Sequence, residues 1–364
     1  MLRTDLANTS DVNKGDALVG FRQPLTGANG STVHHKLSEY ISVKDFGARG
    51  DGRTDDSGAF QNALNSSKSI HVPAGTYLVK DLNPPSECTI MCEGFDAIIK
   101  GVSEADTIFK TTEFRSLLHV IGGRWECCKY VWHHNSDHSL SNCLFESMFI
   151  SCCENGFRIN AAVGNVWRNI RVKKADYGWY LGEGTENVIN TNKFLECNLL
   201  AYRSGGIYFV SNESKPMRGN IIRSCWFEDS DHSAIFAGGG SSHLVIADCY
   251  FESTGSTEDA DIVLNQLGSE SIKPTVIIDS CHFAAPKPSQ RSRLMVQGDV
   301  ALLAKDNIAV LRRGDIFARI ETPNRFVIQL INNLLDTAGD GTYESWLYQR
   351  DGMQDVRWAE YWLP

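Results

Sequence analysis

The sequence contains no long hydrophobic run and no excess of basic residues. No stretch approaches the roughly 18 to 20 consecutive apolar residues that a membrane helix requires. The segment from Met1 to Ser10 lacks the apolar run behind a basic flank that marks a secretion signal. We therefore expect a chain that is made in the cytoplasm and does not insert into a membrane. The formal net charge of -9 also argues against a nucleic-acid partner, because phosphate binding needs a basic stripe.

Neither a disulfide framework nor a metal site is expected. The 11 cysteines are an odd number in a chain without a visible secretion signal, so buried thiols explain them better. His133, His134 and His138 surround Asp137, but this segment is typical of a polar turn. It does not indicate the converging ligands that a metal ion needs. We expect no cofactor.

What the sequence does contain is a recurring pattern, apolar-x-x-small-x-aromatic, through its middle. The small position is occupied in successive copies by Ser147, Ile170, Cys197, Cys225, Cys249 and Cys281. The spacing is irregular and falls within the range of roughly 20 to 50 residues that is typical of solenoids and propellers. A β-helix tolerates unequal spacing, because one turn can bulge outward without disturbing the stacked strands. The 31 glycines, against 10 prolines, agree with a turn-rich chain.

Strand alternation assigns the two faces of these repeats. If Cys225 points inward, Phe227 points inward as well. Trp226 and Glu228 then point outward. The inward columns read Cys197, Cys225, Cys249, Cys281 and Leu199, Phe227, Phe251, Phe283, which would fill a narrow apolar lumen. The outward columns read Met148, Arg171, Asn198, Trp226, Tyr250, His282 and Ile150, Lys173, Leu200, Glu228, Glu252, Ala284.

These patterns predict an all-β fold, a right-handed single-stranded parallel β-helix over residues 39–298. A short helix near residues 55–66, with Phe60 and Leu64 on its buried side, is expected to cap the open end of the first coil. After Gln297 the apolar pattern changes, and we expect residues 299–364 to form a β-rich, antiparallel cap that blocks the open end and binds neighbours. Residues 1–38 hold few large apolar residues and are assigned to a leader segment.

The residues around the expected helix resemble a known family. VKDFGA (43–48), GDG (50–52), TDD (54–56) and VPAGTY (72–77) resemble the opening of pectate-lyase-like proteins related to rhamnogalacturonases and polysaccharide epimerases. Three earlier segments, LRTDL (2–6), LVGF (18–21) and the stretch 32–39, resemble the leader of bacteriophage and prophage tailspike proteins. The resemblance is specific over residues 1–80 and architectural beyond them. It implies a homotrimer in the virion tail, held together by residues 299–364 and joined to tail or baseplate proteins through residues 1–38. It also implies a structural role for the acidic loop at Asp51.

Tailspikes of this architecture commonly bind, and often cleave, surface polysaccharide, and the outward columns offer residues for both. Adjacent coils stack about 4.8 Å apart, so we expect Glu228 and Glu252 to be neighbouring carboxylates. Sugar rings pack on aromatic side chains, while an acidic pair supplies a general acid and a nucleophile or base, here at a spacing that favours a retaining glycosidase. The predicted catalytic residues are Glu228, Glu252, Asp229 and Asp231. The predicted substrate-binding residues are Trp226, Tyr250, His282 and Arg171.

Other interpretations stay open. Most exposed glutamates are simply solvated, so the same scaffold also suits a non-catalytic receptor-binding or structural tail protein. A polysaccharide lyase would need a basic side chain near a charge-neutralising cation, and Arg171, Lys173 and His282 lie on the right face but several coils apart. A bacterial lyase or hydrolase unconnected with phage is disfavoured by the leader motif. The expected ligand is a host capsule or lipopolysaccharide.

Overall fold

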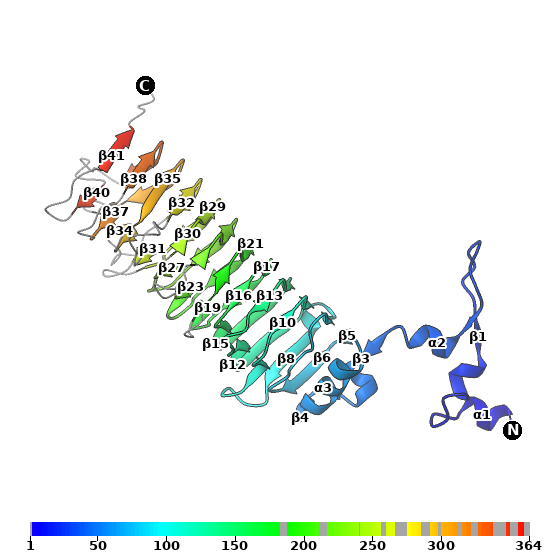
Figure 1. The fold of residues 1–364 in the computed structure, drawn as a ribbon. Helices are drawn as coiled ribbons and strands as arrows, with labels where there is room; N and C mark the ends of the chain where they lie inside the picture. The colour runs from blue at the N-terminus through cyan, green and yellow to red at the C-terminus, as the bar shows by residue number, and fades with distance from the viewer. Residues whose placement is uncertain are drawn as a thin grey trace.

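The computed structural model describes residues 2–182, 188–210, 217–239, 241–255, 260–265, 275–284, 292–297, 300–311, 315–321, 327–337, 347–349 and 356–359. Within these residues the chain is mostly strand, and the strands stack in parallel from coil to coil as a β-helix (Figure 1). A short segment with small helices precedes the coils at their N-terminal end. No helix in the described part of the chain is long and apolar enough to span a membrane.

Three sheets run along the coils in the described residues. The long sheet contains β3 (Ile41–Ser42), β5 (Ser69–Val72), β7 (Thr89–Cys92), β11 (His119–Ile121), β14 (Leu144–Glu146), β17 (Val166–Arg168), β21 (Lys193–Leu195), β25 (Ile221–Arg223), β29 (Leu244–Ala247), β32 (Thr275–Asp279), β35 (Ala301–Lys305), β38 (Val327–Ile331) and β41 (Val356–Ala359). The narrow sheet contains β10 (Arg115–Ser116), β13 (Leu140–Ser141), β16 (Ala162–Val163), β20 (Ile189–Asn190), β24 (Met217–Arg218) and β28 (Ser241–Ser242).

The third sheet, which we call the bent sheet, has two arms. Its first arm contains β4 (Asp51–Asp55), β6 (Gly75–Val79), β8 (Ala97–Gly101), β12 (Arg124–His134), β15 (Phe149–Ile159), β18 (Arg171–Lys173), β22 (Asn198–Leu200), β26 (Trp226–Glu228), β30 (Tyr250–Glu252), β33 (His282–Phe283), β36 (Ile308–Leu311) and β39 (Leu334–Thr337). Its second arm contains β9 (Thr107–Thr111), β19 (Tyr177–Leu181), β23 (Gly205–Val210), β27 (Ile235–Gly238), β31 (Ala260–Asn265), β34 (Ser292–Val296), β37 (Ile316–Ile320) and β40 (Leu347–Gln349). The long strands β12 and β15 pair with strands of both arms, so the bend begins inside them.

The lumen is filled by the predicted inward columns. Cys225 and Phe227 are 1% and 0% exposed, whereas Trp226 between them is 45% exposed, which confirms the assignment of faces. The ring of Phe251 stacks between those of Phe227 and Phe283, with centroid distances of 5.1 and 4.9 Å. Burying each phenylalanine contributes about 1.5 to 3 kcal/mol, so the stacked column is a main source of stability.

Each coil leaves the long sheet through a residue in the left-handed conformation. These residues form a column directly before the inward cysteine column: Ser147, Asn169, Glu196, Ser224, Asp248, Ser280, Asp306 and Asn332, all with φ between 50° and 57°. Small polar residues tolerate this conformation better than others, which explains most members of the column. The amide of Ser224 donates to the carbonyl of Ala247 in the next coil (3.0 Å), so the turns are linked as the strands are.

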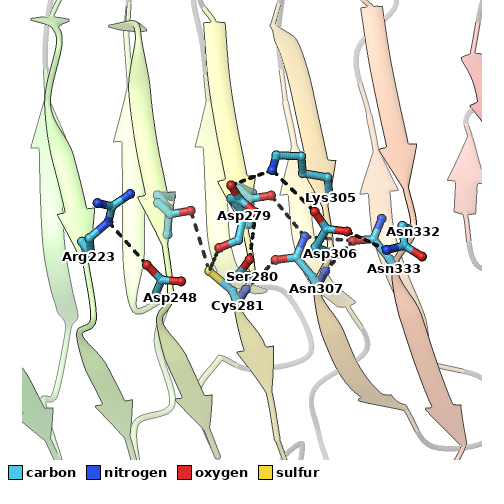
Figure 2. A network of polar contacts seen from close by, with 12 residues as sticks. Arg223, Asp248, Asp279, Ser280, Cys281, Lys305, Asp306, Asn307, Asn332 and Asn333 are labelled. Carbon is cyan, nitrogen blue, oxygen red and sulfur yellow. Dashed lines mark hydrogen bonds and ion pairs between the residues drawn. The ribbon is translucent and has the colours of Figure 1, made fainter.

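Polar side chains connect the corners of successive coils. Inside the turn before the first arm, the Asn307 Nδ2 donates to the Asn333 Oδ1 (2.9 Å) and to the carbonyl of Ile278 (3.2 Å). On the outside of this corner, the Lys305 Nζ lies 2.8 Å from an Asp279 carboxylate oxygen (Figure 2). At the corner that follows the narrow sheet, a matching ladder runs through Asn165, Asn192 and Asn220, each amide bonding to the next. These ladders satisfy buried backbone groups that the turns leave unpaired.

The bend between the arms needs small residues. A Cβ added to Gly178 would lie 2.9 Å from the carbonyl oxygen of Gly206 and 2.5 Å from the side chain of Leu199. Gly156 and Gly206 are equally restricted. These strands of the second arm therefore begin at glycine corners.

The predicted capping helix is confirmed as α3 (Ser57–Ser66) at the N-terminal end of the coils (Figure 1). Phe60, Ala63 and Leu64 are buried, and the ring of Phe60 meets the edge of Tyr77 at 5.2 Å. In the acidic loop, the Asp51 carboxylate accepts bonds from the Thr54 and Arg53 amides and the Thr54 hydroxyl. These bonds lower the pKa of Asp51 to about 2. All of them are made within the loop, so the Asp51 carboxylate stabilises a turn. The other short elements are α1 (Leu2–Leu6), η1 (Gly15–Leu18), β1 (Gly20–Phe21), β2 (Ser31–Thr32), α2 (Val33–Leu37), η2 (Val43–Phe46) and η3 (Gly94–Asp96).

Two expectations are wrong. The strands after residue 298 do not form an antiparallel cap, because β35 pairs in parallel with β32, and β38 and β41 continue the same sheet. Alternating apolar residues fit parallel and antiparallel strands equally well, so the sequence pattern could not separate them.

In the outward columns, Phe149 and Ser151 take the places expected for Met148 and Ile150. This slip of one residue moves Met148 into the core, where it is 1% exposed.

Candidate functional site

The predicted outward column is continuous on the first arm of the bent sheet. Arg171, Asn198, Trp226, Tyr250 and His282 pair in register through five successive strands, β18, β22, β26, β30 and β33. The rings of Trp226 and Tyr250 lie 4.8 Å apart, and those of Tyr250 and His282 lie 5.2 Å apart, both edge to face. We call Trp226, Tyr250 and His282 the aromatic strip. It is a ridge of partly exposed rings along the helix axis.

The two predicted carboxylates lie beside this strip. Glu228 and Glu252 are register partners in β26 and β30, so successive coils place them as neighbours, and both are partly buried. The Tyr250 hydroxyl donates to the Glu252 Oε2 at 2.9 Å. Partial burial raises the pKa of Tyr250, and the bond to Glu252 and the charges of Glu252 and Glu228 raise it further. Tyr250 therefore stays a protonated donor that orients Glu252.

The two predicted aspartates lie in the turn that follows β26. Asp229 has a left-handed backbone (φ 56°), and its amide donates to the carbonyl of Glu252 at 3.1 Å. Asp229 and Asp231 are both exposed. The turn leads to Ser233, whose hydroxyl contacts the Tyr208 hydroxyl at 2.9 Å on the second arm. The aspartates thus stand at the Glu228 edge of the strip, between the two arms.

Arg171 lies in the same column as the strip but is separated from Trp226 by one coil, that of Asn198. Its side chain is exposed, as are those of His282 and Lys173. Lys173 and His282 lie in different coils with three strands between them, so these predicted basic residues do not meet at one point on the first arm.

His134, one of the clustered histidines, is fully buried and holds the coil together. Its Nε2 donates to the carbonyl of His138 at 2.6 Å, and its Nδ1 lies 2.8 Å from the Thr111 hydroxyl. Burial lowers the pKa of His134, which agrees with a neutral ring in this position. No group of three or more metal-ligating side chains converges in the described part of the chain.

Sequence reasoning missed a second aromatic array, on the second arm. The rings of Tyr180 and Tyr208 stack at 6.4 Å, and those of Tyr208 and Phe236 at 4.9 Å. Tyr177 meets Tyr208 edge to face at 4.9 Å. We call these four residues the tyrosine ladder. The sequence did contain a signal for this array. In the segments that follow the glycine corners, every second residue beyond the bend points outward.

A surface hollow was also missed. It has a volume of about 530 Å³ and lies where the arms of the bent sheet meet, next to β12, β15, β18 and β19. Its lining is mostly charged and thiol groups: Glu104, Ala105, Cys128, Lys129, Cys152, Cys153, Glu154, Lys174, Asp176 and Arg203. We call it the charged hollow. These residues come from bends whose register is not visible in the sequence.

Comparisons with known proteins agree with this fold. Residues 40–114 match the family described as rhamnogalacturonase A/epimerase, pectate lyase-like, and residues 129–284 match the right-handed β-helix region. The tail spike protein of an Escherichia phage is 43% identical over 68 residues, which are 19% of this chain and 8% of that protein. The tail spike protein of Shigella phage Sf6 is 45% identical over 67 residues, 18% of this chain and 10% of that protein. The matched segments thus span a tenth or less of these relatives.

Solved structures share the fold at low sequence identity. A tailspike mutant of Escherichia coli bacteriophage HK620 in complex with a pentasaccharide has a TM-score of 0.53 and 12% identity, covering 95% of this chain and 70% of that chain. The catalytic domain of Agl-KA has a TM-score of 0.54 and 14% identity, covering 85% and 69%. This chain therefore has the right-handed β-helix fold, and its residues 40–114 are pectate-lyase-like. Its distant, partial relatives include phage tailspike proteins.

Proposed function

We propose that this chain is part of a phage tailspike that binds host surface polysaccharide, capsule or lipopolysaccharide, along the aromatic strip. The observation that carries the proposal is the unbroken run of Trp226, Tyr250 and His282 in three successive coils, with Trp226 45% exposed. Pyranose rings have apolar faces that pack on aromatic rings, and hydroxyl groups that bond to flanking polar side chains. Arg171 and Asn198 extend the same column and supply donors for a longer chain of sugars.

We further propose that the bound polymer is cleaved by glycoside hydrolysis at Glu228 and Glu252. In a retaining reaction one carboxyl group protonates the leaving oxygen while the other attacks the anomeric carbon, and water then releases the glycosyl group. The Tyr250 hydroxyl holds Glu252, which suits the attacking role, and leaves Glu228 as the acid and base. Asp229 and Asp231 are the proposed alternatives for the acid, since they stand at the same edge of the strip.

The test combines binding and cleavage. Purified chain is incubated with capsular polysaccharides and lipopolysaccharides from candidate hosts, and viscosity and released reducing ends are followed. We expect wild type to cleave one of them, and Glu228→Gln and Glu252→Gln to bind it without cleaving it. Glu196→Gln, at an exposed corner, is the matched control and should retain full activity. Full activity in both variants would eliminate this pair. Binding without cleavage by wild type would identify a non-catalytic receptor-binding protein, and an unsaturated product would identify a lyase.

The proposed place of the chain is the virion tail, as a homotrimer joined to tail or baseplate proteins through residues 1–38. Large apolar side chains in this leader segment are unusually exposed, among them Val12 (72%), Leu25 (68%) and Leu37 (60%). Exposed apolar side chains in one segment are typical of a surface that packs against a partner. Light scattering that gives the mass of one chain would exclude the trimer. Deleting residues 1–38 should prevent incorporation into virions while leaving polysaccharide binding intact.

A further inference from the structure

The charged hollow lies outside the aromatic strip and combines features of a small-ligand site. Its volume of about 530 Å³ falls within the range of roughly 300 to 1,000 Å³ of sites that hold small molecules. Three carboxylates and three cationic side chains line it, so its formal charges cancel. We propose that the charged hollow binds one neutral pyranose residue of a host polysaccharide. This inference rests on the proposed function, because the sugar would belong to the same polymer.

Two carboxylates at the bend are arranged to accept bonds from adjacent sugar hydroxyls. Glu154 and Asp176 occupy equivalent positions in successive coils, and the Asp176 amide donates to the Glu154 carbonyl at 2.9 Å. The Arg203 Nε donates to the Asp176 Oδ1 at 2.5 Å, and the Tyr130 hydroxyl donates to the Glu154 Oε1 at 3.1 Å. An ionised carboxylate has about four acceptor sites. Each one is thus held in place by a protein donor and keeps the capacity to accept from a ligand.

The remaining polar groups complement these acceptors. Lys129 and Lys174 line the hollow and supply ammonium donors for ring or hydroxyl oxygens. The Tyr130 hydroxyl holds Glu154 from outside the lining, and Tyr177 directly follows Asp176 in the chain. A neutral sugar uses both the donors and the acceptors. A uronate would have to desolvate its own charge in a hollow that offers no net positive charge in return, so we expect the hollow to prefer a neutral sugar.

The hollow contains a reporter of its own occupancy. Cys152 lines it and is the exposed cysteine of this chain, while Cys127 is partly buried and the other cysteines are buried. Burial raises the pKa of Cys127, Cys128 and Cys153 nearby, which slows their reaction with alkylating reagents. Alkylation of the native, folded chain should therefore occur first at Cys152, and a sugar in the hollow should slow it.

The experiment measures the rate of Cys152 alkylation by a maleimide, using mass spectrometry, with and without short oligosaccharides. The probes are fragments of a neutral O-polysaccharide and of a uronate-containing capsule, and binding of each is measured separately by calorimetry. We expect a bound neutral fragment to slow alkylation by about tenfold or more, and the acidic fragment to give no protection at equal concentration. Protection by the acidic fragment alone would overturn the assignment of a neutral sugar.

Variants connect the protection to the proposed contacts. Glu154→Gln and Asp176→Asn should each weaken protection by about tenfold, because each removes a charged acceptor. Tyr130→Phe keeps the ring but removes the donor that positions Glu154, so a smaller loss is expected. Asp137→Asn, at an exposed turn outside the hollow, is the matched control and should change nothing. Unchanged protection in both carboxylate variants would overturn the proposal.

The same data separate this inference from the proposed function. Binding of a neutral fragment without protection of Cys152 overturns the charged hollow as a site and leaves the aromatic strip standing. Protection that persists in a Trp226→Ala, Tyr250→Ala double variant shows that the hollow binds without the strip. Failure of every host polysaccharide and fragment to bind overturns both proposals.

Discussion

The inner and outer faces of the same strands differ sharply in exposure. On β26 and β30, Phe227 and Phe251 are fully buried and stacked, while Trp226 and Tyr250 on the opposite face remain partly exposed. The inner face is closed to ligands, because its rings already contact one another. The outer face has equally large rings and no stacked cover in the described residues. This contrast suggests that inner residues carry stability and outer residues carry function, and each prediction below tests one side of it.

The largest effect is expected in the lumen. Phe251→Ala removes the central ring of the stack between Phe227 and Phe283 and leaves a cavity that rigid strands cannot fill. We expect a loss of about 3 to 5 kcal/mol in the free energy of unfolding, measured by denaturant unfolding. Trp226→Ala on the outer face of the neighbouring strand is the control, with a change within about 0.5 kcal/mol. Equal losses in both variants would remove the distinction between the faces.

A second prediction concerns the later coils, which contain a buried ion pair. Arg293 and Asp261 form an ion pair at 2.8 Å with side chains 1% and 0% exposed, and the Arg293 Nη2 also donates to the carbonyl of Val310 at 3.1 Å. Arg293→Met leaves a buried carboxylate without its cation and should cost on the order of 3 kcal/mol. The double variant Arg293→Met, Asp261→Leu should recover much of that loss. Urea midpoints measure both, and a double variant that is less stable than the single one would contradict this account.

A smaller effect is expected from pH. Burial lowers the pKa of His134 below its ordinary value of 6.5, with the nearby charges of Arg115 and His138 acting in the same direction. The unfolded chain therefore binds a proton at His134 more readily than the folded chain does. This contribution to stability is complete above pH 6.5 and is lost as the pH falls from 6.5 towards the lowered pKa. Melting temperatures across this range should fall less for His134→Gln than for wild type, with His243→Gln, at an exposed position, as the control. If the melting temperature of His134→Gln fell with pH as steeply as that of wild type, this role of His134 would be contradicted.

Much of the fold could be predicted from the sequence, because like residues stack in successive coils. The column from Cys197 to Cys281 fixed the register of the first arm, and that register correctly places Glu228 beside Glu252. The pattern failed at Met148, where the repeat has no cysteine and two alignments differ by one residue. It failed again after residue 298, because alternation does not encode strand direction.

The two candidate sites also differ in how well the sequence predicts them. The aromatic strip lies on regular strands, where alternation alone decides which side chains point outward. The charged hollow depends on the bend inside β12 and β15, and on turns that bring Lys129, Asp176 and Arg203 to one place. Turn geometry of this kind is not periodic. Glu154 and Asp176 therefore look like ordinary surface residues until the coils are assembled.

The central claim is that the aromatic strip binds polysaccharide without supporting the fold. The most direct test is to measure polysaccharide affinity and melting temperature together for the Trp226→Ala, Tyr250→Ala double variant. We predict a melting temperature close to that of wild type and an affinity for the host polysaccharide that is weakened by about tenfold or more. A folded double variant that binds the polymer with wild-type affinity would contradict the claim.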